Sequence, residues 1–296
     1  MGSDSDPSTK KNVSRTESPG ASTRISYPPR IDELKVIAKE LRRKVLRMIF
    51  VAGSGHQGGS LSEIEILASL YFGVMRIDPQ NPDWVARDRF ILSKSHACPG
   101  LYAVLAQKGF FPEDELDTFR KINSRLQGHA HIKTPGVEMS GGSLGQGLSF
   151  GLGCALSARI DSDSYHTYVL LGDGECDEGQ IWEAAMAAAH YGLDNLTVIV
   201  DRNRIQNDRF TDEVMKLEPF ADKWKAFGWN VLKIDGHDFA SLIDAFASAR
   251  KHSSQPTVII ADTVKGKGIS FMENNPAFHA SPPTEEDYNK AMLELE

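Results

Sequence analysis

The stretch that decides the fold is residues 170–207, LLGDGECDEGQIWEAAMAAAHYGLDNLTVIVDRNRIQN. An apolar run over residues 168–171 predicts a strand that ends at Gly172-Asp173-Gly174, and the alanine-rich residues 180–190 have helical composition and spacing. A second apolar run, residues 196–200, ends just before Asn203. Strand, turn, helix and strand form a βαβ unit, whose two strands end at the same edge of a sheet. We therefore expect Asp173 and Asn203 to lie close together.

The chemistry that these two residues favour is the binding of a metal ion and a phosphate group. Asp173 offers an anionic oxygen and Asn203 a neutral amide oxygen, and Mg²⁺ or Ca²⁺ takes oxygen ligands of both kinds. Gly172 and Gly174 allow the backbone to approach a ligand closely. A plain β-turn before an acidic helix start, with Glu178 favoured by the helix dipole, is the alternative. The Asn at the end of the next strand favours the metal site.

These residues also resemble a known pattern. Gly172-Asp173-Gly174, followed at this spacing by Asn203, resembles the thiamine diphosphate fingerprint, and residues 172–184, GDGECDEGQIWEA, are similar to its transketolase version. The resemblance extends from about His56 to His279. It implies that thiamine diphosphate is held through Mg²⁺ (or Ca²⁺), with the backbone carbonyl of Ile205 completing the protein ligands of the metal.

Towards the N-terminus, residues 53–58, GSGHQG, match the glycine pattern of dinucleotide-binding loops. That pattern must follow a strand, whereas residues 31–48 have the apolar spacing of a helix, so we reject a dinucleotide site. The resemblance implies instead that His56 contacts the donor sugar and shuttles protons. A turn histidine with its hydrogen bonds satisfied is the alternative.

Two further histidines lie in predicted loops. A short strand at residues 89–93 leads to His96, which by resemblance contacts the diphosphate, although a helix-capping histidine would look the same. Residues 112–127 are expected to form a polar helix. His129 aligns with the transketolase Gly-His-Pro motif, in which it would bind donor hydroxyls, although Ala130 departs from that motif. No third ligand of matching type accompanies the His129-Ala130-His131 run, so a zinc site is discounted.

Two further segments complete the resemblance, one rich in glycine and one that contains a proline. Residues 139–147, MSGGSLGQG, precede a predicted helix at residues 148–158 and resemble the transketolase G-x-L-G-Q-G turn. Gly142, Ser143 and Leu144 are thereby implied to contact the aminopyrimidine and thiazolium rings. Residues 278–282 resemble the transketolase His-Gly-x-Pro segment, which implies that His279 reaches both the diphosphate and the substrate. Residues 265–268, KGKG, could hold phosphate, but they lack the P-loop pattern, and we expect a solvated turn there.

The order of predicted elements indicates the fold class. Further strands are expected at residues 229–234 and 257–261, with a helix at 239–250 between them. Strands that alternate with helices favour an α/β fold with a doubly wound, mainly parallel sheet. We expect one diphosphate-binding domain, residues 27–296, after a polar, serine-rich disordered tail, residues 1–26. A transit peptide is disfavoured because the tail contains acidic residues.

Composition narrows the class of protein. The chain has 296 residues, 41% of them hydrophobic and 25% charged, and a formal net charge of -7, which argues against a nucleic-acid partner. No apolar run approaches the roughly 18 residues that a membrane span needs. Cys98, Cys154 and Cys176 have no metal-binding or disulfide-framework spacing, and we expect a cytoplasmic protein.

The resemblance covers only the first half of a transketolase. It therefore implies the N-terminal subunit of a split enzyme, assembled with a C-terminal-half chain as a heterotetramer of two of each. Such an enzyme would transfer a two-carbon ketol unit between sugar phosphates, by default in the pentose phosphate pathway. Glu178 matches the acid that hydrogen-bonds the activating glutamate of the missing half. The alternatives are the α chain of a 2-oxo acid dehydrogenase, a deoxyxylulose phosphate synthase fragment, or a non-catalytic binding protein.

Overall fold

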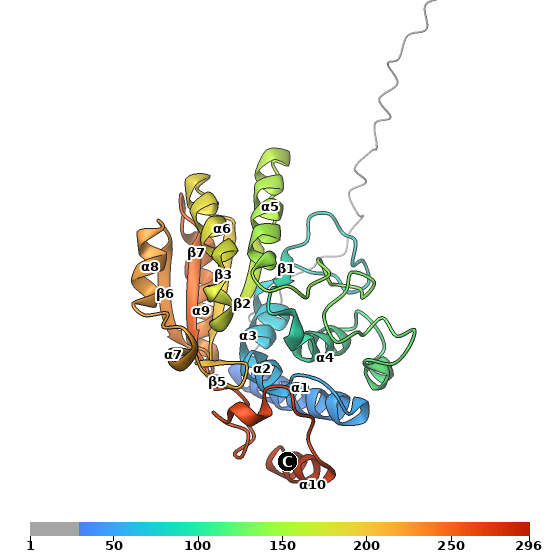
Figure 1. The fold of residues 1–296 in the computed structure, drawn as a ribbon. Coiled ribbons are helices and arrows are strands. Elements are labelled where there is room, and N and C mark those ends of the chain that lie inside the picture. The colour runs from blue at the N-terminus through green and yellow to red at the C-terminus, as the bar shows by residue number, and fades with distance from the viewer. Residues whose placement is uncertain (1–29) are drawn as a thin grey trace, which may run out of the picture.

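The computed structural model describes residues 30–296, so the expected tail lies outside the described residues. Five parallel strands form one sheet in the order β1-β2-β3-β7-β6 (Figure 1). The strands are β1 (Arg89–Leu92), β2 (Thr167–Gly172), β3 (Leu196–Arg202), β7 (Thr257–Asp262) and β6 (Asn230–Asp235). This order confirms the α/β class with a parallel sheet.

Helices cover both faces of this sheet, as a parallel sheet requires. Side chains alternate along β2, so Tyr168 and Leu170 join one hydrophobic cluster while Val169 and Leu171 join the other. The first cluster includes residues of α1 (Ile31–Ala52), α2 (Gln57–Ser62), α3 (Ile64–Ser69), α4 (Cys98–Lys108) and α9 (Phe239–Lys251). The second includes residues of α5 (Gln146–Asp161), α6 (Gly179–His190) and α8 (Phe220–Ala226).

Glycine explains why α5 can pack so closely on the sheet. A Cβ atom at Gly151 would lie 2.3 Å from Cγ2 of Val169 on β2, a separation that real Cβ atoms do not show. Any larger residue would push the helix away from the strand. Glycine at position 151 is thus a packing requirement.

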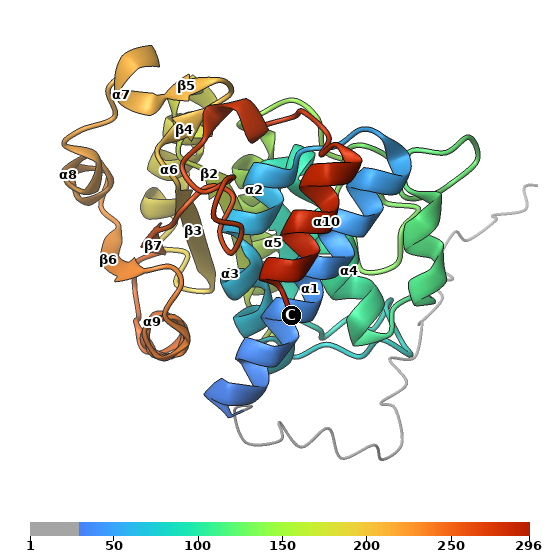
Figure 2. The same cartoon turned by 90° about the horizontal axis from the view of Figure 1, so that it is seen from below.

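The C-terminal helix α10 (Glu285–Glu294) lies along α1, as Figure 2 shows. The rings of Phe50 and Tyr288 stack with centroids 4.3 Å apart, and Arg43 donates to the carbonyl of Leu295 at 3.1 Å. The last residues of the chain therefore help to cover the first helix. No helix within residues 30–296 is long and apolar enough to cross a membrane.

One predicted helix is wrong. In place of a helix over residues 112–127, the chain forms only a short 3₁₀ segment, η3 (Glu113–Thr118), followed by turns. Arg120 and Asn123 have φ values of 60° and 67°, which are left-handed conformations that a right-handed helix cannot contain. The remaining short elements are η1 (Leu70–Val74), η2 (Ser95–Ala97), η4 (Gly174–Asp177), β4 (Ile205–Gln206), β5 (Arg209–Phe210), α7 (Thr211–Val214) and η5 (Pro276–Phe278).

Candidate active site

A cavity of about 400 Å³ lies beyond the carboxyl ends of β1, β2, β3 and β7, where α/β sheets of this kind bind ligands. Eleven of the thirteen residues predicted for the site line it: His56, His96, His129, Gly142, Leu144, Gly172, Asp173, Gly174, Asn203, Ile205 and His279. They come from segments far apart in the sequence. The structure therefore brings together most of the predicted residues.

Asp173 is a buried carboxylate at the start of η4. Its Oδ1 accepts from the backbone N–H of Gly174 at 2.8 Å, and its Oδ2 accepts from the backbone N–H of Arg204 at 2.6 Å. Nη1 of Arg202 lies 3.3 Å from the same Oδ2. Burial, reinforced by the nearby Asp201, still raises the pKa of Asp173 to about 6. The position thus favours an additional cation.

Asn203 and Ile205 supply neutral oxygens beside that carboxylate. Nδ2 of Asn203 donates to Asp201 at 3.0 Å, while its Oδ1 accepts the backbone N–H of Ile205 at 3.1 Å. Within residues 30–296, no group of three or more His, Cys, Asp or Glu side chains is arranged to hold a metal. An ion here would therefore depend on one carboxylate with amide and carbonyl oxygens, a donor set that fits Mg²⁺ or Ca²⁺.

Lys265 contradicts the expectation of a solvated turn. Its side chain is buried, lines the cavity and donates from Nζ to the carbonyl of Ile205 at 3.0 Å. Burial lowers the pKa of this ammonium to about 8, although Asp173 opposes the shift. Gly266, at φ +80°, allows the turn, because a Cβ there would lie 2.3 Å from the carbonyl oxygen of Met272. The loop therefore folds inward and places a cation in the site.

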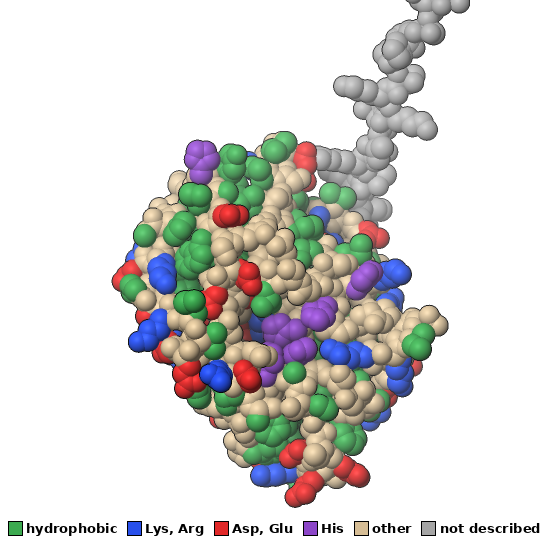
Figure 3. All heavy atoms as spheres, viewed as in Figure 1, with side chains coloured by type: hydrophobic (Ala, Val, Ile, Leu, Met, Phe, Trp, Pro, Cys, Tyr) green, Lys and Arg blue, Asp and Glu red, His purple; other side chains and the backbone are tan. Residues whose placement is uncertain are grey.

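Four histidines form what we call the histidine cluster: His56, His96, His129 and His279. The ring of His56 lies 5.1 Å from that of His96, 5.2 Å from that of His279 and 6.4 Å from that of His129, between centroids. Figure 3 shows histidine side chains gathered near the middle of one face of the molecule. The cluster joins loops that follow α1, β1 and β7 with the loop before α5.

Burial favours the uncharged form of these rings. Burial is the main cause that lowers the pKa of His56 to about 4 and that of His279 to about 3, and it also lowers the pKa values of His96 and His129. Nδ1 of His56 and Nδ1 of His279 are buried without a hydrogen-bond partner among the described residues. Unpaired buried nitrogens are costly in an isolated chain. They fit a ligand that has both donors and acceptors, such as a diphosphate with a polyol.

Ser143 and Glu178 are the two predicted residues that do not line the cavity. Both are exposed, and Glu178 stands at the N-cap position of α6 without a side-chain capping bond. Glu178 lies against the glycine turn, since a Cβ at Gly145 would be 2.9 Å from the Cβ of Glu178. Their predicted roles in the site stay predictions.

Glu175 is a buried residue that the sequence reasoning missed. Its Oε1 accepts from the backbone N–H of Gly145 at 2.9 Å and from the hydroxyl of Ser93, and its Oε2 accepts from the N–H of Gly172 at 3.0 Å. Burial raises the pKa of this carboxyl group. Glu175 thus ties together the loops after β1 and β2 and the turn before α5. In the sequence Glu175 looks like one more acidic residue near a helix start. The only sequence signal for it is its position two residues after Asp173.

Comparisons with known proteins agree with this geometry. The family described as transketolase, thiamine diphosphate binding domain, matches residues 34–295. The chain is 46% identical over 265 residues to a 6-deoxy-6-sulfo-D-fructose transketolase subunit, SqwG, of Clostridium sp. (strain MSTE9), covering 89% of this chain and 96% of that one. It is 43% identical over 265 residues to an apulose-4-phosphate transketolase subunit of Phocaeicola vulgatus, covering 90% of this chain and 94% of that one.

The solved structures that match are longer. A transketolase from Campylobacter jejuni subsp. jejuni superposes with a TM-score of 0.85 at 33% identity, covering 89% of this chain but 43% of that one. The transketolase from Leishmania mexicana gives a TM-score of 0.83 at 32% identity, with 88% and 41% covered. The chain thus spans less than half the length of these transketolases and nearly the full length of the subunit relatives.

Proposed function

The chain belongs to the transketolase family and carries its thiamine diphosphate-binding domain, and we propose that it acts as the N-terminal subunit of a two-chain transketolase. The observation that carries this proposal is the cavity that Asp173, Asn203 and Ile205 line together with the four residues of the histidine cluster. Relatives of the same length are named as transketolase subunits, which supports a division of the enzyme between two chains.

In this proposal residues 27–296 are one domain that holds the diphosphate end of the cofactor. Asp173, Asn203 and the carbonyl of Ile205 would hold Mg²⁺ or Ca²⁺. The diphosphate would be held by His96, Gly172, Gly174, Asn203, Lys265 and His279. When bound, thiamine diphosphate supplies the carbanion chemistry that makes and breaks carbon–carbon bonds at a carbonyl.

The histidine cluster would handle the sugar. A neutral imidazole offers one N–H donor and one acceptor nitrogen, so it can accept from one hydroxyl while it donates to another. The low pKa values of His56 and His279 keep these rings neutral across the physiological range. With His129, they would orient the donor hydroxyls and hold or release a proton at a ring nitrogen during the reaction.

The exposed residues of the site would face the partner chain. Gly142, Ser143 and Leu144 would contact the ring portion of the cofactor, and Glu178 would hydrogen-bond the activating glutamate of a C-terminal-half subunit. Glu178 is exposed, which leaves it accessible to another chain. We infer a heterotetramer with two of each chain and the cofactors between unlike chains.

The substrates in this proposal are a ketose phosphate donor and an aldose phosphate acceptor in the cytoplasm, with pentose phosphate metabolism as the setting. The relatives named above act on a sulfonated ketose or on apulose 4-phosphate. Both names describe anionic sugars, which supports an anionic sugar as the substrate class here.

The test is reconstitution. Purified chain, a C-terminal-half transketolase subunit, Mg²⁺ and thiamine diphosphate should together transfer a two-carbon unit, as measured by product analysis, whereas this chain alone should give no product. Full turnover by the lone chain would contradict the split site. Release of CO₂ from a 2-oxo acid would favour a dehydrogenase or synthase subunit instead. Failure to bind the cofactor even with the partner would favour a non-catalytic role.

A further inference from the structure

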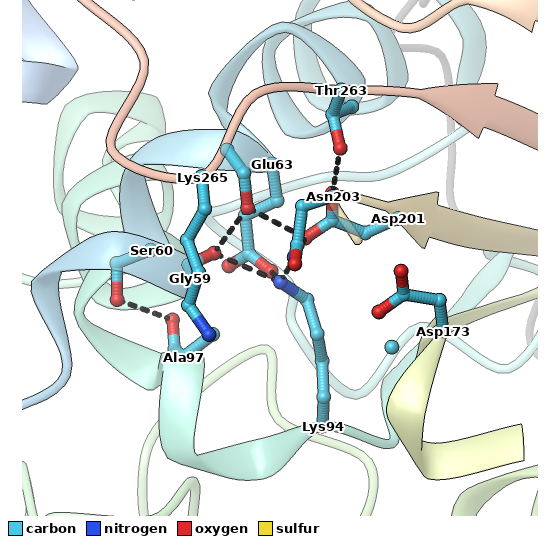
Figure 4. Close-up of polar contacts among 12 residues, drawn as sticks. Gly59, Ser60, Glu63, Lys94, Ala97, Asp173, Asp201, Asn203, Thr263 and Lys265 are labelled. Carbon is cyan, nitrogen blue, oxygen red and sulfur yellow. Dashed lines mark hydrogen bonds and ion pairs between the residues drawn. The ribbon is translucent and has the colours of Figure 1, made fainter. Parts of the chain in front are cut away.

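Beside the cavity lies a set of three buried ionisable residues that we call the ion cluster: Glu63, Lys94 and Asp201 (Figure 4). Nζ of Lys94 lies 2.6 Å from Oδ2 of Asp201, 2.8 Å from Oε2 of Glu63 and 2.8 Å from the carbonyl oxygen of Gly59. An ammonium group has three N–H donors. Although Lys94 lines the cavity, its Nζ already lies within 2.8 Å of these three oxygen atoms.

Asp201 is the member of the ion cluster that faces the metal-binding residues. Its Oδ2 accepts from the hydroxyl of Ser62 at 2.6 Å, from Lys94 and from Nδ2 of Asn203, and its Oδ1 accepts from the hydroxyl of Thr263. Every contact that this carboxylate makes comes from a donor. An ionised carboxylate can only accept hydrogen bonds, so it can only face the amide nitrogen of Asn203 and never the amide oxygen.

The two ends of the Asn203 amide have nearly the same shape but opposite chemistry. With the nitrogen turned to Asp201, the oxygen must point the other way, where the backbone N–H of Ile205 occupies one of its two lone pairs. The second lone pair is left on the cavity side. Figure 4 shows the side chains of Asn203 and Asp201 side by side.

We propose that Asp201 is a positioning residue that orients the Asn203 amide so that its oxygen serves as a metal ligand, and that Lys94 acts by holding Asp201. This inference rests on the proposed function, because the ligand role of Asn203 belongs to it. Outer partners that orient a metal ligand contribute strongly to affinity although they never touch the ion.

The first test measures metal affinity instead of turnover. Mn²⁺ is titrated into the full chain with thiamine diphosphate, with and without the partner chain, and free Mn²⁺ is followed by electron paramagnetic resonance. Asp201→Asn replaces the charged acceptor beside Asn203 with a neutral amide, which holds the nitrogen of the Asn203 amide more weakly. We expect its Mn²⁺ affinity to fall by about 10- to 100-fold.

Thr263→Val is the matched control for this titration. It removes the contact to Oδ1 of Asp201 but leaves Oδ2 and its bond to Asn203, so its Mn²⁺ affinity should stay within a few-fold of the wild type. Wild-type affinity in Asp201→Asn would overturn the proposal. An equal loss in both variants would also overturn it, because loosening of the fold would then explain the effect.

A second measurement needs neither metal nor cofactor. In nuclear magnetic resonance spectra, the side-chain amide hydrogens of Asn203, assigned by their loss in Asn203→Asp, should exchange slowly with solvent in the wild type. Fast exchange in the wild type would overturn the proposal even if Asp201→Asn fails to fold. If the wild type binds no Mn²⁺ with cofactor and partner, the proposed function fails, and slow exchange would still support the orientation of the amide by Asp201.

Discussion

The ion cluster and the histidine cluster lie at the same edge of the sheet, but their hydrogen bonding differs. In the ion cluster, Nζ of Lys94 lies within 2.8 Å of three oxygen atoms, two of them from the carboxyl groups of Glu63 and Asp201. In the histidine cluster, Nδ1 of His56 and Nδ1 of His279 are buried without a partner among residues 30–296. We infer that the first cluster stabilises the structure of the site, whereas the second keeps ring nitrogens available for a ligand.

The energetics of burial explain why both arrangements can exist side by side. A buried charge costs several kcal/mol unless opposite charges and hydrogen bonds compensate it, so the buried ammonium of Lys94 needs the oxygen atoms that surround it. An unpaired neutral polar group costs about 1–3 kcal/mol, which a fold can tolerate where a ligand will satisfy it. Variants in the two clusters should therefore have opposite effects on stability and on binding.

The largest effect is expected from Lys94→Met. It leaves the buried carboxylate of Asp201 without its cation and should lower the free energy of unfolding by about 3–5 kcal/mol. Urea unfolding measures this loss. Lys225→Met, at an exposed ion pair with Asp222, is the control and should change stability by less than about 1 kcal/mol. Equal effects in the two variants would show that the ion cluster does not hold the fold.

The next effect concerns pH. Burial is the main cause that raises the pKa of Glu63 to about 8, so the folded chain keeps a proton that the unfolded chain releases near pH 4.5. This contribution to stability is complete below that pH and is lost as the pH rises towards 8. From pH 5 to pH 8, wild type should lose stability relative to Glu63→Gln, on the order of a few kcal/mol. A constant difference in unfolding free energy across these pH values would contradict the shift.

Lys265→Met should show that the two buried lysines, Lys265 and Lys94, have different roles. Lys265 makes a hydrogen bond to the carbonyl of Ile205 and already has a pKa lowered to about 8, so its removal should cost less stability than Lys94→Met. Binding of inorganic diphosphate with Mg²⁺ should weaken by about 1.5–3 kcal/mol, the contribution typical of a hydrogen bond to a charged group. Calorimetry measures that binding. Unchanged diphosphate affinity would remove Lys265 from the anion site.

The smallest stability effect is expected in the histidine cluster. Burial lowers the pKa of His56 to about 4. Below pH 6.5 the unfolded chain therefore binds a proton at this ring while the folded chain does not, and stability falls as the pH drops. His56→Gln should flatten this decline, with a change of about 1 kcal/mol or less after solvent screening at the half-buried ring. Ketol transfer by the reconstituted enzyme should fall strongly. A stability loss as large as that of Lys94→Met would erase the contrast between the clusters.

Sequence reasoning found the candidate ligands at the strand ends. It missed the buried charged residues that lie around these ligands. Asp173 and Asn203 each follow an apolar run, so their meeting at one edge of the sheet follows from the βαβ pattern. Asp201 looks like the last residue of a strand, and Lys94 like part of a polar turn. Lys265 was expected in solvent because a glycine-rich loop gives no sign of which way it folds. The helix expected over residues 112–127 failed because local polarity does not reveal the left-handed turns at Arg120 and Asn123.

By itself, the sequence determined the alternation of strands and helices, the metal-binding pattern and the resemblance to transketolases, because these depend on periodicity and short spacings along one chain. Only the tertiary structure decided which polar groups are saturated and which remain free. Glu63, Lys94 and Asp201 lie on three separate elements, and their contacts arise from the order of strands in the sheet and the helices packed against it. Hydrogen-bond saturation is a property of atoms brought together in space, and local sequence pattern does not encode it.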